Sequence, residues 1–223
     1  MVKLDILSDP ICPWCLIGKA QLERALEARP DHPFAIEWHP FQLNPDMPPE
    51  GADRRTYLEE KFGGKERAVQ IYSRIAGHAD AAGIEINFEG IKRTPNTLDA
   101  HRLIHWAGIE GAQHRVVAAL MRAYFQEGRD IGDRDTLADI ADNEGLDAAV
   151  IRKLLDSPAD TDDIRARDIA AREMGVNSVP TFIVAGKHAV PGAQSTEVWL
   201  RVIDEIMAQE NASVTGLETG GQD

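Results

Sequence analysis

The hydrophobic period of the chain changes twice, and these two changes constrain its fold more than any other feature. Residues 3–41 alternate, then repeat at helical spacing, then alternate again, which predicts a strand, a helix and a second strand. From about residue 53 to residue 172 almost every segment is amphipathic and helical, with glycines between the segments. Strand patterns return in "VPTFIVAG" and "KHAVPG", and a helical stripe follows them. The predicted order is therefore β-α-β, a helical block, and β-β-α.

The two ends of this order fit one α/β unit. We expect residues 1–48 and 173–210 to form a thioredoxin-type sheet flanked by helices. Residues 49–172 are too long for a loop, so we expect them to form an inserted all-helical domain that covers one side of the sheet. Within this block "GIEINF" reads as a short strand, and the polar, glycine-rich residues 211–223 read as a flexible tail.

Composition excludes several classes of partner. The 223 residues carry a formal charge of -13, which argues against nucleic acid and against an anionic membrane, since both need a basic surface. No stretch approaches the roughly 20 apolar residues of a membrane span. The start, "MVKLDILSD", is too short and too acidic for a signal peptide, so we expect a cytoplasmic protein. Cytoplasmic thiols are kept reduced, and structural disulfides are rare there.

The chain has two cysteines, Cys12 and Cys15, in the motif "CPWC". Four interpretations are open: a zinc half-site, a structural disulfide, two unrelated core cysteines, or a redox pair. Zinc sites usually combine two ligand pairs, and no second C-x-x-C motif is present. His101 and His105 share a helix face, but the spacing is that of a helix packed against its neighbour. We therefore expect no metal, and the reducing compartment disfavours a structural disulfide.

The surroundings of the motif favour the redox pair. Pro13 suits the first position of a helix, which makes Cys12 the N-cap residue. The N-terminus of a helix stabilises negative charge, so we expect the Cys12 thiolate to be stabilised and the sulfur to be exposed. Cys15 lies nearly one turn further along, sheltered but close enough to form a disulfide. Cys12 would attack a substrate disulfide, and Cys15 would then resolve the mixed disulfide.

Residues outside the motif could assist this chemistry. If the bond between Val179 and Pro180 is cis, Val179 faces the cysteines and its backbone could pair with a substrate segment. A trans proline that merely starts a strand is the alternative. Glu37 and His39 lie on the strand beside the active-site helix, where they could shuttle the proton of Cys15 or simply form a solvated strand face. Asp9 reads as a turn residue ahead of Pro10, and Trp14 as an exposed contact for a substrate.

The combination of "SDPICPWC", the long helical block, "GVNSVPTFIV" and "VPGAQSTEVWL" resembles the DsbA family of thioredoxin-like proteins. "WHPFQLNP" and "NTLDAHRL" are similar to its cytoplasmic FrnE-type members. The resemblance implies a thioredoxin fold with a helical insertion and thiol–disulfide oxidoreductase activity. It implies that Cys12 is the nucleophile, Cys15 the resolving cysteine and Pro180 the cis-proline, while Pro13 and Trp14 tune the redox potential. Some FrnE-type proteins carry a further cysteine pair, which this chain lacks.

Related families leave a second function open. Kappa-class glutathione transferases and 2-hydroxychromene-2-carboxylate isomerases share this layout, but they carry serine at the position of Cys12. They also carry a Ser-Asp pair where this chain has Ala193 and Gln194. The expected function is a protein thiol–disulfide oxidoreductase, with a glutathione-dependent small-molecule isomerase or transferase as the alternative. A non-enzymatic redox-switched binding protein is a third hypothesis.

Partners would be thiols or disulfides of proteins or small molecules. No cofactor is expected, glutathione could be a co-substrate, and a monomer or a dimer fits the sequence.

Overall fold

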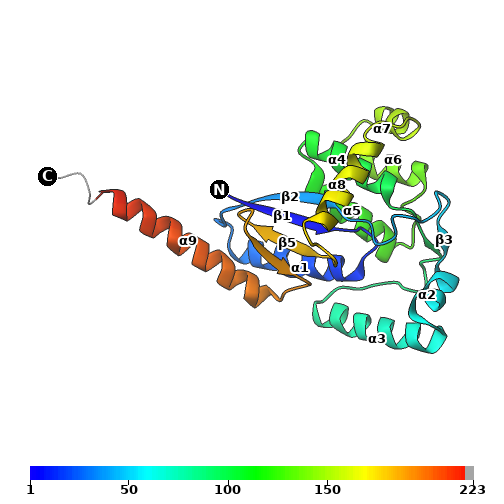
Figure 1. Cartoon of the computed structure of the whole chain (residues 1–223), viewed down its shortest axis with the longest axis horizontal. Coiled ribbons are helices and arrows are strands. Elements are labelled where there is room, and N and C mark those ends of the chain that lie inside the picture. Colours follow the sequence, from blue (N-terminus) through cyan, green and yellow to red (C-terminus); the bar gives the residue numbers. More distant parts are fainter. Residues whose placement is uncertain (219–223) are drawn as a thin grey trace.

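A four-stranded mixed sheet forms the centre of the protein, as the computed structural model shows for residues 1–218, with side chains described as far as Glu210 (Figure 1). The strands lie in the order β2-β1-β5-β6, and their bounds are β1 (Val2–Ser8), β2 (Phe34–Pro40), β5 (Thr181–Val184) and β6 (His188–Pro191). β2 is parallel to β1, β5 is antiparallel to β1, and β6 is antiparallel to β5. Helix α1 (Pro13–Ala28) joins β1 to β2, and α9 (Thr196–Glu218) follows β6. The predicted thioredoxin arrangement is confirmed.

One face of this sheet is covered by α1 and α9. Ile6 pairs with Trp38 on one side and with Phe182 on the other, so these three side chains share a face. Gly18 of α1 lies against Phe182, and a Cβ at Gly18 would be 3.4 Å from the Phe182 ring. The same ring packs at 4.7 Å, centroid to centroid, on the fully buried Trp199 of α9. The helix that carries the cysteines is thereby fixed on the sheet.

The block between β2 and β5 is helical, as predicted. Its elements are β3 (Ala52–Asp53), α2 (Arg54–Phe62), α3 (Lys65–Ala81), β4 (Arg93–Thr94), α4 (Leu98–Ile109), α5 (Gln113–Phe125), α6 (Arg134–Asn143), α7 (Ala148–Leu155) and α8 (Thr161–Glu173). Aspartates start several of these helices, and Asp53, Asp133 and Asp147 accept backbone N–H groups of the first turn. The strand predicted at residues 83–88 is wrong, because that segment pairs with no strand. The extra pairing is instead that of β3 with β4.

The interior is shared between the sheet and the helical block. Leu4 of β1, Leu120 of α5 and Leu137 of α6 belong to one continuous cluster of buried apolar side chains. α5 and α8 both contact β2. A second, smaller cluster joins Ile17 of α1 to Ile75 of α3. The helices thus complete the packing of the sheet, while the predicted domain boundary at residues 49–172 stays a prediction.

The last helix runs further than the sequence suggested. Residues 211–218, expected in a flexible tail, continue α9, since no proline interrupts the run that starts at Thr196. The second half of α9 extends away from the sheet (Figure 1). Residues 219–223 of the expected tail lie outside the described residues. Among the helices described, none combines the length and apolar character that a membrane span needs.

Candidate active site

The two cysteines lie at the junction between β1 and α1: Cys12 directly precedes α1, and Cys15 lies in its first turn. Cys12 is the N-cap residue of α1, with extended backbone (φ -84°, ψ 117°), and Pro13 occupies the first turn. The backbone N–H of Cys12 donates to the carbonyl oxygen of Asp9 at 2.9 Å, and that of Cys15 donates to the carbonyl oxygen of Cys12 at 3.0 Å. Both thiols are free. This tight turn brings the two side chains together at the start of the helix, as the spacing predicts.

Cys12 faces the segment before β5. Its thiol donates to the carbonyl oxygen of Val179, with a sulfur-to-oxygen distance of 3.6 Å. The peptide bond between Val179 and Pro180 is cis. Cys12 and Val179 are 167 positions apart in sequence, so only the fold could bring them together.

Cys12 is less accessible than the sequence suggested. We expected an exposed sulfur, but the residue is only 4% exposed. The reason is that elements distant in sequence, among them α2, α3 and the segment before β5, lie over the turn that carries Cys12. A pocket of about 320 Å³ leads to Cys12, and its walls come from α1, α2, α3, β4 and the segment before β5. We call it the Cys12 pocket, and the lining residues that matter below are Cys12, Trp14, Asn44, Arg54, Tyr72 and Thr94.

Cys15 is the more deeply enclosed thiol, at 1% exposure. Burial raises the pKa of Cys15 well above its ordinary value, and the hydrogen bond and charge of Cys12 raise it further. The backbone N–H of Asp9 opposes this rise, whereas the carboxylate charge of Asp9 adds to it. The two thiols therefore differ in surroundings, as the redox prediction requires.

Asp9 is a buried carboxyl group that the sequence interpretation treated as a turn residue. It has no exposed surface, and it accepts the N–H of Leu43 at 2.7 Å and that of Ile11 at 3.3 Å. Burial raises the pKa of Asp9 to about 7, although these N–H groups oppose the rise. His101 lies 4.0 Å from Asp9, and burial lowers the pKa of this imidazole to about 4. Asp9 is thus a buried carboxyl group whose pKa is raised by burial and whose charge raises that of Cys15.

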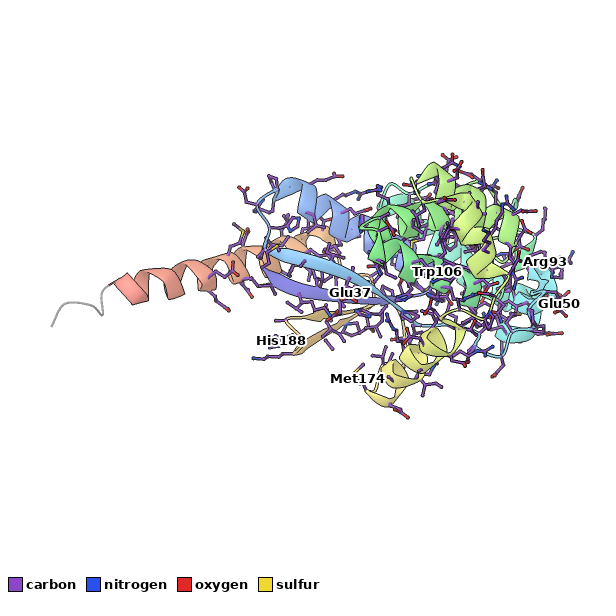
Figure 2. The ribbon with its side chains drawn as sticks, turned by 90° about the horizontal axis from the view of Figure 1, so that it is seen from above. Glu37, Glu50, Arg93, Trp106, Met174 and His188 are labelled. Carbon is purple, nitrogen blue, oxygen red and sulfur yellow. The ribbon has the colours of Figure 1, made fainter. Side chains whose placement is uncertain are left out.

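The proposed shuttle residues Glu37 and His39 are not part of this arrangement. They alternate with Trp38, whose face α1 covers, so both point to the opposite face of the sheet. His39 Nε2 lies 2.6 Å from Asp5, and Lys3 is 2.9 Å from both Asp5 and Glu37. Figure 2 shows Glu37 on the sheet. The shuttle prediction fails because the sheet lies between these side chains and Cys15.

Asp5, Glu37 and His39 also form the one group of potential metal ligands found among the described residues. Their ligand atoms lie within 4.8 Å of one another. The ammonium group of Lys3 already contacts both carboxylates at 2.9 Å, so the negative charge of the group is compensated by the chain itself. The residues fit an ion-pair cluster better than a metal site.

Trp14 is half-buried, not exposed as predicted. Its ring lies 5.0 Å from that of His78 on α3, and it packs against the apolar cluster between α1 and α3. Trp14 therefore forms part of the wall of the Cys12 pocket.

Gly18 sets the distance between α1 and the cis-proline. A Cβ at this position would lie 3.0 Å from Cγ of Pro180 and 3.3 Å from Cα of Ala193. We expect Gly18→Ala to lower the free energy of unfolding by about 1 kcal/mol in urea denaturation, because overpacking outweighs the gain in helix propensity. Gly77→Ala is the control, since a Cβ there meets nothing within 4 Å and should stabilise α3 by about 0.5–1 kcal/mol. Equal effects of the two substitutions would contradict the tight packing at Pro180.

Comparisons with known proteins agree with this geometry. Residues 3–204 match the family of DSBA-like thioredoxin domains. The uncharacterized protein YwbO of Bacillus subtilis (strain 168) is 30% identical over 205 residues, which cover 92% of this chain and 96% of YwbO. The crystal structure of a probable DsbA oxidoreductase from Streptomyces coelicolor superposes with a TM-score of 0.83 at 30% identity, and the match covers 93% of this chain and 91% of that one.

A more distant structure shares the fold. The cytosolic disulfide reductase DsbM from Pseudomonas aeruginosa, solved with GSH, gives a TM-score of 0.64 at 19% identity and covers 96% of this chain and 99% of that one. The predicted relationship to the DsbA family is confirmed, and the finer FrnE-type assignment stays a prediction. Because the family match spans residues 3–204 and so includes all four strands of the central sheet, the chain belongs to the family of DSBA-like thioredoxin domains.

Proposed function

We propose that the protein is a thiol–disulfide oxidoreductase whose reactive groups are Cys12 and Cys15. The observation that carries this proposal is the unequal setting of the two thiols. Cys12 stands at the start of α1 and lines an open pocket, whereas Cys15 is enclosed behind it and its pKa is raised. Cys12 lies at the N-terminus of α1, where the unpaired N–H groups of a helix point, and the thiolate is the form of cysteine that attacks a disulfide.

The exchange takes two steps. The Cys12 thiolate attacks one sulfur of a substrate disulfide, a mixed disulfide forms, and the first substrate thiolate leaves. Cys15 then loses its proton and attacks the Cys12 sulfur, the second substrate thiolate leaves, and the Cys12–Cys15 disulfide forms. Two electrons pass from the protein to the substrate, and each leaving thiolate takes up a proton. Oxidation of a substrate dithiol is the same sequence in reverse.

Asp9 takes the proton in the second step of this proposal. Cys15 must be deprotonated to attack, and its pKa is raised well above the ordinary value. Asp9 lies close enough for its charge to affect that pKa, and its own pKa of about 7 matches a base at neutral pH. Transfer of the proton to Asp9 also removes the negative charge that opposes the Cys15 thiolate.

Pro13, Trp14, Val179 and Pro180 position the reactants in this scheme. Pro13 and Trp14 separate the two sulfurs and tune the potential of their disulfide. The Val179 carbonyl, which accepts the Cys12 thiol at 3.6 Å, would hold a substrate backbone once the thiolate has formed.

We propose thiols and disulfides, with glutathione as one co-substrate, as the partners, and the cytoplasm as the compartment. The support is the structural similarity to the cytosolic disulfide reductase DsbM, which was solved with GSH. An isomerase or transferase of the same fold is the alternative. It would have no need of Cys15, so the enclosed second thiol favours the oxidoreductase.

Equilibration against glutathione tests the proposal. The protein is incubated in buffers of defined reduced-to-oxidised glutathione ratio, quenched by alkylation and weighed by mass spectrometry. We expect reversible loss of two alkylation sites as a Cys12–Cys15 disulfide forms. A potential above the cytosolic poise of about -220 to -260 mV would indicate an oxidant or isomerase, and one at or below it a reductase. If no intramolecular disulfide forms at any ratio, the proposed function is wrong.

A further inference from the structure

Residues with unpaired buried polar atoms are concentrated in the lining of the Cys12 pocket. Among the described residues, five buried side-chain atoms have no hydrogen-bond partner, and three of them are Arg54 Nη2, Asn44 Nδ2 and Thr94 Oγ1. All three residues line the pocket that contains Cys12. Buried polar groups are nearly always paired, so three such atoms around one pocket need a common explanation.

Arg54 is the most informative of the three, because it is a buried cation without a carboxylate partner. Only 6% of the residue is exposed. Nη1 donates to the Tyr124 hydroxyl at 2.8 Å, and the guanidinium lies over the rings of Tyr72 and Tyr124 at 5.1 and 5.8 Å. None of the ion pairs among the described residues includes Arg54, although the chain has 37 acidic and 24 basic residues. A buried charge normally requires a counter-charge, and guanidinium groups match carboxylates in geometry.

Asn44 presents a donor in a fixed orientation. Its Oδ1 accepts from the Tyr57 hydroxyl at 2.5 Å and from Lys61 at 3.5 Å. These two donors determine which side of the carboxamide is oxygen, so Nδ2 is the side left unpaired.

Thr94 adds a hydroxyl on β4. Residue Thr94 is only 2% exposed, and its Oγ1 can donate as well as accept. Three residues of the pocket lining thus carry a positive charge and three unpaired polar atoms that can donate, which together suit a group rich in acceptors and negative in charge.

We propose that the Cys12 pocket binds a low-molecular-weight thiol or disulfide that carries a carboxylate, with the carboxylate on Arg54, Asn44 and Thr94 and the sulfur at Cys12. This rests on the proposed function, and it names the class of substrate. The pocket volume of about 320 Å³ and the 4% exposure of Cys12 favour a small molecule over a segment of a folded protein.

The reaction of the oxidised protein with such a thiol balances as follows. One thiolate attacks the Cys12 sulfur, the Cys12–Cys15 bond breaks, and Cys15 takes up a proton. A second thiolate attacks the bound thiol's sulfur and releases Cys12 as a thiolate. Two thiols are oxidised to one disulfide, and the protein disulfide is reduced.

N-Acetylcysteine and its amide provide a matched pair of probes, since only the first carries a carboxylate. The oxidised full-length protein is reduced with each, and the rate constants are compared per thiolate. We expect the carboxylate thiol to react about 10-fold faster or more with the wild-type protein, because charge-assisted hydrogen bonds are the strong ones. Arg54→Gln should bring this ratio close to unity, whereas Arg55→Gln, an exposed neighbour paired with Glu59, should leave it unchanged.

Two results would overturn the inference: a wild-type ratio near unity, or a ratio that survives Arg54→Gln. If Arg54→Gln does not fold, as judged by circular dichroism, Asn44→Asp replaces it. This substitution keeps an oxygen for Tyr57 and Lys61 and turns the free donor into an anion. The ratio should then fall by about 10-fold, and an unchanged ratio would overturn the inference. Reduction by both thiols at equal rates refutes the inference alone, whereas failure of the disulfide to form refutes the proposed function.

Discussion

Replacement of Cys12 by serine is expected to slow the release of nitrothiobenzoate from dithiobis(nitrobenzoic acid) by roughly 10³-fold or more. With the wild-type reduced protein we expect two phases, one for attack by Cys12 and one for resolution by Cys15. Serine at position 12 removes both phases, because a hydroxyl does not ionise near neutral pH and Cys15 is only 1% exposed. Stopped-flow absorbance resolves the two phases.

Cys15→Ser is the matched control, since it also replaces a sulfur atom by oxygen, nearly one helical turn away from Cys12. We expect the first phase to remain and the second to vanish, with the nitrothiobenzoate group retained on the protein by mass. If Cys12→Ser reacts at the wild-type rate, the roles of the two thiols have been assigned incorrectly.

Asp9→Asn is expected to slow the second phase by about 100-fold at pH 7.5 and to leave the first phase unchanged. The reason is that Asn cannot accept the proton of Cys15, whose pKa burial raises. In the wild-type protein the rate of the second phase should rise as pH passes about 7, where Asp9 loses its proton and becomes a base. In the variant this rise should shift to higher pH, toward the titration of Cys15 itself.

Asp5→Asn serves as the control for this pH profile. Asp5 lies on the same strand, but it contacts Lys3 and His39 on the opposite face of the sheet. We expect its pH profile to match that of the wild-type protein. A normal second phase in Asp9→Asn would show that the proton of Cys15 leaves by another route.

The order of elements could be predicted because it depends on local periodicity. Residues 53–172, which were expected to be helical, contain α2 to α8 in the structure apart from the last residue of α8, whereas α9 runs eight residues past its expected end at residue 210. The predicted strand at residues 83–88 fails for a physical reason: alternation describes a half-buried segment, but a strand also needs a partner. The β3–β4 pair was missed because two residues per strand leave almost no pattern.

The two thiols of the candidate site could be predicted, but the groups around them could not. C-x-x-C ahead of a helix is a local signal for Cys12 and Cys15. The burial of Asp9 depends on the N–H of Leu43, which is 34 residues away. Arg54 reads as the start of an exposed helix, and only the packing of α2 against Tyr124 reveals it as buried. Glu37 and His39 were named as possible shuttles because their strand runs beside the active-site helix, but this neighbourhood does not tell on which face of the sheet the side chains lie.

The continuous interior of this protein has a consequence for its evolutionary history. Leu120 and Leu137 of the inserted helices belong to the same hydrophobic core as Leu4 of β1. The insertion therefore shields part of the sheet from solvent. A chain from which these helices were deleted would expose to solvent the apolar side chains that now pack against them. Loss of the helical segment would therefore have to be accompanied by substitution of the apolar side chains of β1 and β2 that it covers.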